Sequence, residues 1–249
     1  PIEVQRKIYT ILRRADWLRQ KREQANQLTN KIIQSVFLKM FGDPVRNPKG
    51  WKITTIGDHA KIRYGTGSPP PYEENGIPFV RATNIKMGKI VKHETKFISA
   101  ESAKRIEKCR LHEGNLLIVR SGVNTGDCAY VTREYDGAYA AYDLILDFDE
   151  ELNSRFVWEI LNMPYGRTIM KPMTVRAAQP HLNAGQVSSI RVPKPPVELQ
   201  HKFVLFIEEL DALDERQMQS TYEINELFHS MMHKAFRGGV ATAKITSEA

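Results

Sequence analysis

Residues Pro1-Ile2-Glu3-Val4-Gln5-Arg6-Lys7-Ile8 have a second version in the chain, Pro196-Val197-Glu198-Leu199-Gln200-His201-Lys202-Phe203. The correspondence, at an offset of 195 positions, continues without a gap to Phe41 and Phe236. It includes eleven identities over 41 positions. A period of this length is too long for a solenoid repeat. The chain therefore uses one structural element twice and places a separate domain between the two copies.

Both copies are predicted to be long helices. Apolar residues recur every three or four positions over about five heptads, which is typical of a helix with a narrow apolar seam. Neither 2–41 nor 197–236 contains Gly or Pro. At about 1.5 Å per residue each helix would span roughly 55–60 Å, more than an ordinary surface helix. The residues predicted to form the pairing seam are Ile8, Ile11, Leu18, Ile32, Phe203, Phe206, Leu210, Leu213 and Leu227.

The charge is distributed unevenly along the chain. Residues 1–49 carry a net charge of +7, residues 50–195 carry +4 and residues 196–249 carry −4. A basic and an acidic helix suit each other as partners, and a single helix cannot bury its seam alone. We therefore expect the helices to pair with each other or with other subunits. The basic surplus elsewhere suits a polyanionic partner.

Composition limits the class of protein. The 249 residues leave room for one sizeable domain plus extended elements, and 41% hydrophobic and 26% charged residues are ordinary for a soluble protein. No apolar run approaches the roughly 18 residues of a membrane helix, and no signal peptide opens the chain. The two cysteines, Cys109 and Cys128, lack metal or redox spacing. These features predict a cytoplasmic protein with no membrane partner.

The middle of the chain is predicted to be a mixed α/β domain. Gly, Pro and Asn residues between positions 42 and 50 end the first helix. We predict helices at 99–108 and 155–162, the second capped by Ser154. Pro193, Pro195 and Pro196 are expected to end the sheet and start the second long helix. The predicted strands are 59–64, 77–80, 89–93, 115–122, 126–131, 138–148 and 187–192.

Four stretches in this order, together with the duplicated helix, resemble the specificity subunit of type I restriction–modification systems. They are Trp51–Gly57, Gly76–Arg81, Leu117–Gly122 and Pro195–Gln200. The resemblance implies target-recognition domains that each read one half of a bipartite DNA site, with two long antiparallel helices fixing the distance between halves. It further implies that methylation and cleavage belong to separate methyltransferase and restriction subunits.

The resemblance sets the expected organisation. The expected fold is an α/β (α+β) target-recognition domain flanked by two long α-helices that form an antiparallel coiled-coil-like pair. The expected segments are a long helix at 1–42, the recognition domain at 43–195, the second helix at 196–237 and a flexible tail at 238–249.

This chain departs from the family plan because it has one recognition domain, not two. Pro1 aligns with Pro196, which directly follows a recognition domain, and one further repeat of 195 would give 444 residues. The chain is therefore either the C-terminal half of a longer subunit or a half-sized subunit that forms a homodimer.

A sequence-specific DNA-binding protein needs cationic side chains to contact phosphates. It needs planar arginine guanidinium groups, amides and hydroxyls to contact base edges. Such residues follow the ends of predicted strands and the second short helix. The candidate DNA-binding residues are Arg81, Asn84, Arg120, Ser121, Asn124, Lys171, Arg176 and Gln179. The alternative is that they are ordinary solvated loop residues, and Arg120 has the further alternative of a structural salt bridge to Asp143 or Asp127. Tyr72, Tyr139 and Tyr142 are predicted to be partly buried packing residues.

No catalytic motif is present in the sequence. It lacks the Asp/Asn-Pro-Pro-aromatic stretch of amino-methyltransferases, a Gly-x-Gly-x-x-Gly loop and a His pair at metal spacing. The acidic run Asp147–Glu151 is interpreted as a solvated strand-to-helix turn, and His93, His112 and His181 are interpreted as isolated.

We predict a non-catalytic, sequence-specific subunit that binds double-stranded DNA. It is expected to bind no metal or cofactor, with S-adenosylmethionine, ATP and Mg on the methyltransferase and restriction partner subunits. Two alternatives stay open: the recognition region of a fused restriction–methylation enzyme, and a coiled-coil scaffold without a DNA function.

Overall fold

The computed structural model describes residues 2–92, 94–174 and 181–236, so the predicted tail at 238–249 lies outside the described residues. It divides into two compact units. Unit 1 consists of Pro1–Val36 and Leu205–Ala249, and unit 2 is Phe37–Val204.

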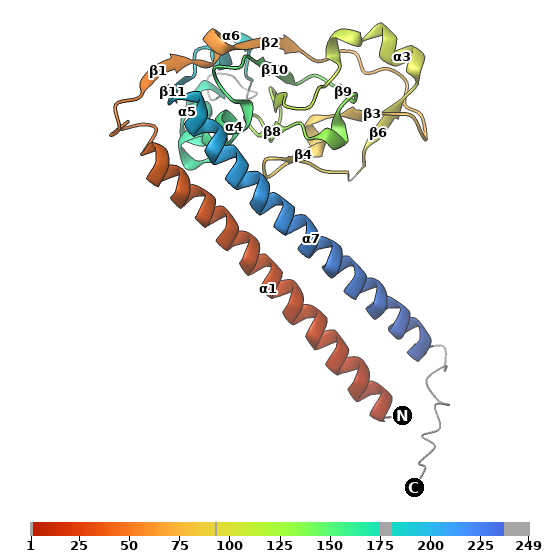
Figure 1. The fold of residues 1–249 in the computed structure, drawn as a ribbon. Helices are drawn as coiled ribbons and strands as arrows, with labels where there is room; N and C mark the ends of the chain where they lie inside the picture. The colour runs from red at the N-terminus through yellow and green to blue at the C-terminus, as the bar shows by residue number, and fades with distance from the viewer. Residues whose placement is uncertain (1, 93, 175–180, 237–249) are drawn as a thin grey trace. The chain divides into compact units, whose positions relative to one another are not determined.

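Two long helices flank unit 2 in the sequence, and their pairing stays a prediction. They are α1 (Ile2–Phe41) and α7 (Val197–Phe236), each 40 residues long (Figure 1). Helix α7 begins after Pro196, whose carbonyl accepts hydrogen bonds from the N–H groups of Leu199 and Gln200. Helix α1 ends at Gly42, which has a φ of 80° and donates its N–H to the Leu38 carbonyl at 2.9 Å. Glycine takes this left-handed conformation without a steric cost, which explains where the helix ends.

Unit 2 is built around a four-stranded antiparallel sheet in the order β2-β10-β7-β8. Its strands are β2 (Ala60–Tyr64), β10 (Leu144–Phe148), β7 (Leu116–Ile118) and β8 (Cys128–Tyr130). Strand β10 lies between β2 and β7, so Leu144 faces Tyr64 on one side and Ile118 on the other. This register places the ends of β2 and β7 beside the start of β10.

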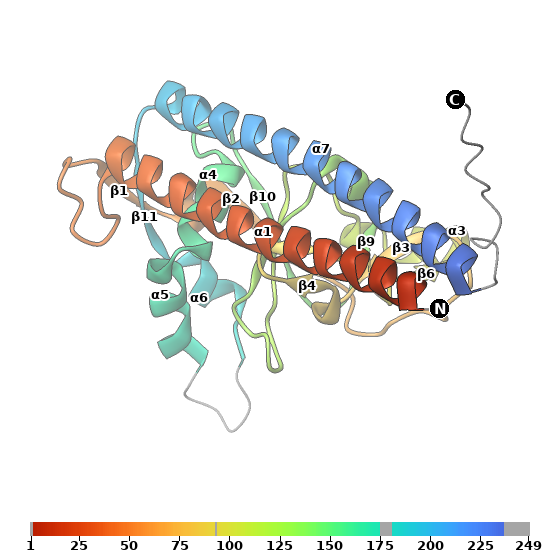
Figure 2. The ribbon, with the colours of Figure 1, turned by 90° about the horizontal axis from the view of Figure 1, so that it is seen from below.

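Three smaller sheets complete unit 2. One has the order β6-β3-β9, with β3 (Ile77–Val80) antiparallel to β6 (Lys96–Ile98) and parallel to β9 (Tyr139–Ala140). Strands β1 (Lys52–Thr55) and β11 (Arg191–Lys194) pair antiparallel. The last sheet pairs β4 (Ile85–Lys86) with β5 (Lys89–Ile90). The β1–β11 pair and the β6-β3-β9 sheet lie at opposite ends of unit 2 (Figures 1 and 2).

Short helices connect these strands and make unit 2 an α+β domain. The α-helices are α2 (Ile56–His59), α3 (Ala100–Arg105), α4 (Ser154–Asn162), α5 (Pro164–Thr174) and α6 (Ala184–Ser188). Three turns of 3₁₀ helix are η1 (Ala82–Asn84), η2 (Glu107–Cys109) and η3 (Arg133–Tyr135).

Several local predictions were wrong. The segment predicted as one strand at 138–148 forms two strands in different sheets, β9 and β10. The segment predicted as a strand at 187–192 starts within α6, because Asn183 and Gln186 form a capping box, and only Arg191–Lys194 is a strand. Pro193 lies inside this strand instead of ending the sheet, which an edge position tolerates because β11 pairs with β1 alone. Helix α4 is capped by Asn153, whose side chain accepts from two backbone N–H groups, and not by Ser154.

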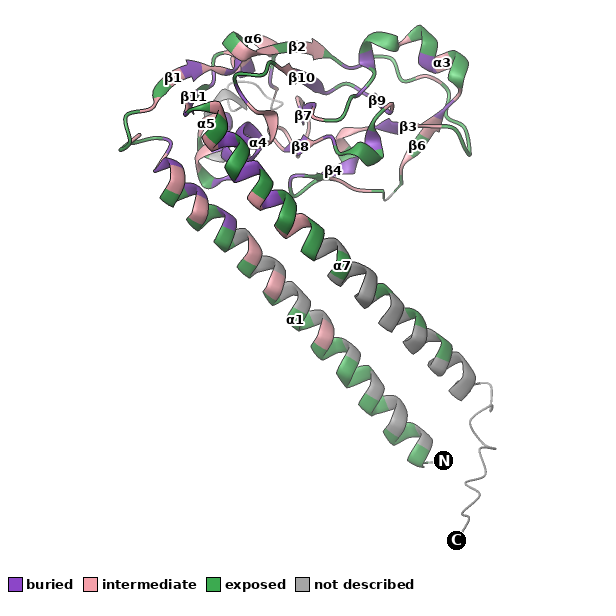
Figure 3. Ribbon diagram, viewed as in Figure 1, coloured by how far each residue is buried: buried purple, intermediate pink, exposed green. Residues whose placement is uncertain are grey.

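The core of unit 2 is formed by its central strands (Figure 3). Leu116–Val119 and Leu144–Leu146 are fully buried. A second buried group contains four phenylalanine rings, Phe37 and Phe41 from the end of α1, Phe156 from α4 and Phe203 from the start of α7. Their ring centroids lie 4.8–5.7 Å apart. This cluster anchors the unit 2 ends of both long helices to the rest of unit 2 by apolar burial.

Candidate nucleic-acid interface

An ordered polar group lies at the surface of unit 2 where β7 ends. The guanidinium carbon of Arg120 lies 4.6 Å from the ring centroid of Tyr64 and 4.2 Å from that of Tyr142. Both rings are themselves exposed, at 40% and 43% of their residue surfaces. Arginine stacks on aromatic faces through its planar charge. A guanidinium is therefore held between two tyrosines at the surface of the sheet.

His181 completes this group, although the sequence indicated that it was isolated. Its Nε2 lies 2.7 Å from Nη2 of Arg120, and its ring centroid lies 6.5 Å from that of Tyr142. The backbone supports the contact, because Ser121 and His181 form an antiparallel bridge and Leu182 donates its N–H to the Arg120 carbonyl at 2.7 Å. We call Tyr64, Arg120, Tyr142 and His181 the Arg120 cluster.

Asp143 lies behind this cluster and is only 3% exposed. Burial raises its pKa to about 6, although the hydrogen bond from the Arg120 backbone N–H and the Arg120 charge act in the opposite direction. The donor to Asp143 is that backbone N–H, at 3.4 Å, while the guanidinium is directed to His181 and the two tyrosines. The alternative of a side-chain salt bridge from Arg120 to Asp143 is therefore not borne out, because the contact with Asp143 is made by the Arg120 backbone.

A close backbone approach brings the two tyrosines together. A Cβ atom on Gly65 would lie 1.5 Å from the carbonyl oxygen of Ala141, so only glycine fits. The Gly65 N–H also donates to the Asp143 carbonyl at 2.9 Å. Because Gly65 follows Tyr64 and Ala141 precedes Tyr142, this contact fixes the two rings as neighbours.

The loop after β7 carries further candidate residues. Ser121 and Asn124 are partly exposed, and Val123 between them is fully exposed. Gly122 and Gly126 have φ values of 97° and 93°, which allow the tight reversal between β7 and β8. In Figure 2 this loop projects from unit 2 on the side to which α5 also extends. It therefore presents hydroxyl, amide and methyl groups beside the Arg120 cluster.

The pair at the end of β3 is more enclosed. Asn84 is 1% exposed; its side chain accepts from the Arg81 N–H and lies within hydrogen-bond reach of the Val91 carbonyl. It therefore organises the strand end and is not presented to a ligand. Arg81 is partly exposed and donates from Nη2 to the Glu94 carbonyl at 2.7 Å.

Three candidates cannot be placed. Arg176 and Gln179 lie outside the described residues, and Lys171 belongs to α5 but its side chain is not described.

The tyrosine predictions have mixed outcomes. Tyr139 is 4% exposed, as predicted for a packing residue. Tyr72 is 43% exposed and packs against Phe79, with ring centroids 6.0 Å apart, whereas Tyr142, also 43% exposed, stacks on Arg120.

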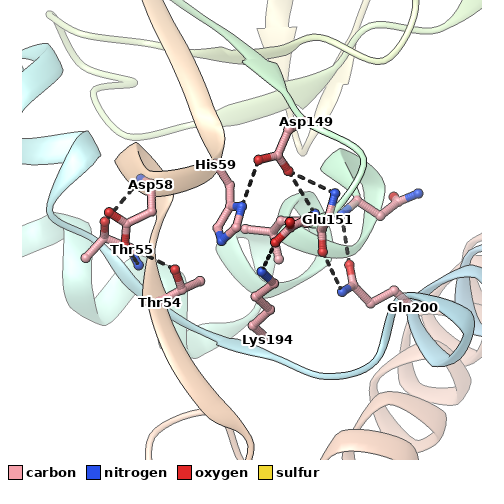
Figure 4. Close-up of polar contacts among 10 residues, drawn as sticks. Thr54, Thr55, Asp58, His59, Asp149, Glu151, Lys194 and Gln200 are labelled. Carbon is pink, nitrogen blue, oxygen red and sulfur yellow. Dashed lines mark hydrogen bonds and ion pairs between the residues drawn. The ribbon is translucent and has the colours of Figure 1, made fainter.

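The acidic run is the strand-to-helix turn that the sequence predicts, between β10 and α4 (Figure 4). Asp149 pairs with His59 at 2.9 Å and Glu151 pairs with Lys194. Fully buried Gln200 closes the turn: its Oε1 accepts from the Asn153 N–H, and its Nε2 donates to the carbonyls of Glu151 and Pro195. The run therefore joins the start of α7 to the rest of unit 2.

An open hollow of about 430 Å³ lies beside this turn. The acidic residues lining it are Glu113, Asp147, Asp149 and Glu150. Carboxylates repel phosphates, so this face is unsuited to DNA.

Among the described residues, no three His, Cys, Asp or Glu side chains converge as metal ligands. In the same part of the chain, no helix is long and apolar enough to cross a membrane.

The predicted helix-pairing residues differ in exposure. Phe203 is fully buried in the phenylalanine cluster of unit 2, whereas Ile32 is 48% and Leu213 is 50% exposed within unit 1. Leu18, Phe206 and Leu210 are partly exposed. The side chains of Ile8, Ile11 and Leu227 are outside the described set. Pairing through this seam stays a prediction.

Comparison with known proteins identifies the family of this fold. Residues 48–226 match the model of the type I restriction modification DNA specificity domain. The chain therefore belongs to this family. It is 21% identical over 270 residues to the type I restriction enzyme EcoBI specificity subunit of Escherichia coli, covering 93% of this chain and 55% of that subunit. It is 19% identical to the MjaVIII specificity subunit of Methanocaldococcus jannaschii, covering 96% and 61%.

Solved structures share the fold. The HsdS subunit from Thermoanaerobacter tengcongensis matches with a TM-score of 0.52 and 19% identity, over 95% of this chain and 57% of that one. The type I S subunit from M. genitalium matches with a TM-score of 0.61 and 14% identity, over 94% and 59%. The chain thus spans little more than half the length of these relatives.

Proposed function

We propose that this chain is a sequence-specific DNA-binding specificity subunit of a type I restriction–modification complex. It directs methyltransferase and endonuclease subunits to a bipartite DNA site and catalyses no reaction itself. S-adenosylmethionine, ATP and Mg then belong to those partner subunits. The observation that carries the proposal is the match of residues 48–226, which include the whole Arg120 cluster, to the DNA specificity domain family.

We place the DNA at the β7 end of the recognition domain. Arg120, Ser121 and Asn124 supply a cation, a hydroxyl and an amide there, which are the groups that contact phosphates and base edges. Arg81 lies at another strand end and stays a proposed contact, as do Lys171, Arg176 and Gln179 in the segment before His181. Asn84 is not a proposed contact, because its buried side chain is directed to the backbone.

The long helices are proposed to pair antiparallel and to act as the spacer that docks the methyltransferase subunits. The opposite net charges of residues 1–49 and 196–249 favour such a pair. Leu213 is 50% exposed in the described chain and would be covered only by the proposed pairing, so Leu213→Asp should disrupt that pairing by placing an unpaired charge in the seam. Leu205→Asp is the matched control, since Leu205 is 59% exposed and lies off the seam. Equal melting temperatures and oligomeric states for both variants would refute this seam.

The repeat favours a second recognition domain at the other end of the helices. Gln200 locks the first turn of α7 to the turn before α4, and the corresponding Gln5 in α1 is exposed. A second domain, from a longer chain or from a second copy of this one, would give Gln5 the same partners. A homodimer would read two identical half-sites, and a longer chain two different ones.

The test is selection of bound duplexes from a random DNA pool, at salt high enough to suppress purely electrostatic binding. Enrichment of a sequence is expected, either as a palindromic pair or as a single half-site. Absence of enrichment, with and without the methyltransferase partner, would refute the proposal and favour a coiled-coil scaffold. The scaffold alternative also predicts that Arg120→Glu leaves every activity intact.

A further inference from the structure

The guanidinium of Arg120 is ordered before any ligand arrives. Two tyrosine rings enclose it at 4.6 and 4.2 Å, and His181 accepts from Nη2 at 2.7 Å. Tyr64 is itself held, because its hydroxyl accepts from the Ala184 N–H at 3.0 Å. A side chain that is already ordered loses little rotamer freedom on binding, which favours affinity and fixes direction. These contacts with Tyr64, Tyr142 and His181 distinguish Arg120 from an ordinary solvated arginine.

The donors that remain define what this group can bind. A guanidinium has five N–H donors. In Arg120 the Nε is enclosed and has no acceptor, and one donor of Nη2 is used by His181. No described residue accepts from Nη1. The end of the fork, formed by Nη1 and the second N–H of Nη2, is therefore the part left for a ligand with two adjacent acceptors.

We infer that Arg120 reads a guanine in the major groove, and that Tyr64, Tyr142 and His181 are positioning residues for that contact. Guanine presents O6 and N7 side by side in the major groove, and the arginine fork matches them. A phosphate also offers two acceptors, but a phosphate contact carries no sequence information and does not require a fixed fork. This inference rests on the proposed function and specifies one base of the site.

The role of His181 requires its Nε2 to be an acceptor, because the guanidinium can only donate. Leucine at this position would remove the acceptor and release one side of the fork. Glutamine would restore an amide oxygen as acceptor. For Tyr142, phenylalanine keeps the aromatic face and leucine removes it. Both positions thus offer a conservative variant and a disruptive one of similar size.

The first experiment uses the full chain and the duplex enriched in the random-pool selection. Each guanine is replaced in turn by 7-deazaguanine, which lacks the N7 acceptor, or by inosine, which keeps N7 and O6. Wild-type protein should lose affinity roughly 5- to 150-fold at one 7-deazaguanine position and little at the matching inosine. Arg120→Ala should lose this sensitivity at that position alone, because alanine has neither donor of the fork.

The second experiment tests the positioning residues on the same duplexes, with melting curves to establish that each variant is folded. Tyr142→Leu and His181→Leu should reduce the 7-deazaguanine sensitivity at that position, while Tyr142→Phe and His181→Gln should retain most of it. Binding to DNA without the selected sequence should change little in all four. A purely structural role would instead affect the melting temperature and leave the base preference unchanged.

Three results would overturn the inference. One is an Arg120→Ala variant that keeps the 7-deazaguanine sensitivity. Another is an Arg120→Ala variant that weakens binding equally for all sequences, which would make Arg120 a phosphate contact. The third is full base preference in both leucine variants. Each differs from failure of the proposed function itself, in which the wild-type chain selects no sequence at all.

Discussion

Replacement of Gln200 by alanine should destabilise the recognition domain by an amount that the structure allows us to work out. The side chain is fully buried and makes three hydrogen bonds, to Asn153 N at 2.8 Å, Glu151 O at 3.2 Å and Pro195 O at 2.9 Å. At about 0.5–1.5 kcal/mol each, their loss amounts to about 2–4 kcal/mol. For a domain of this size each kcal/mol lowers the melting temperature by about 2–4 °C, so we expect a decrease of roughly 4–16 °C.

The repeat supplies a matched control for this measurement. Gln5 occupies the position in α1 that Gln200 occupies in α7, but it is exposed. Gln5→Ala should therefore change the stability of the isolated chain by less than about 0.5 kcal/mol. Thermal unfolding followed by circular dichroism compares the two variants with the wild type. Equal shifts, or a decrease below about 2 °C for Gln200→Ala, would refute the stabilising role of the Gln200 network.

Three further changes test the packing and electrostatics of unit 2. Phe156→Ala should lower the free energy of unfolding by about 3–5 kcal/mol in urea titrations, because its fully buried ring contacts two rings of α1. A decrease below about 1 kcal/mol would contradict the stabilising role of the phenylalanine cluster. Burial raises the pKa of Asp143 to about 6, so its ionisation costs stability as the pH rises from about 4 to 6. Asp143→Asn should consequently be more stable than the wild type by about 3 kcal/mol at pH 7 and equal to it below pH 4, and a pH-independent difference would argue against this. Gly65→Ala should lower the free energy of unfolding by at least about 1–3 kcal/mol in a melting experiment, because its Cβ would lie 1.5 Å from the carbonyl oxygen of Ala141. Gly67→Ala should leave the stability unchanged, because the nearest atom to its Cβ would be 3.8 Å away.

Local patterns predicted the elements that depend on local interactions. The long helices followed from the absence of Gly and Pro, and β7 followed from the apolar run Leu116–Ile118. Helix α5 was not predicted, because Gly166 and Pro172 within it argue against a helix. Its formation depends on close packing, since a Cβ on Gly166 would lie 2.1 Å from the Leu161 carbonyl oxygen. Tertiary contact overrode propensity at this position.

In the candidate site, too, some features follow from the local sequence and others from tertiary contacts. The amino-acid sequence by itself determined the duplicated helices, the single domain between them and the choice of Arg120 as a polar residue at a strand end. Only the tertiary structure decided that Tyr64, Tyr142 and His181 surround it. These residues lie far apart in the chain, and they meet because strand register and the approach of Gly65 to Ala141 bring their backbones together. Such long-range contacts leave no local pattern, since propensity and periodicity report only on residues within a few positions of one another.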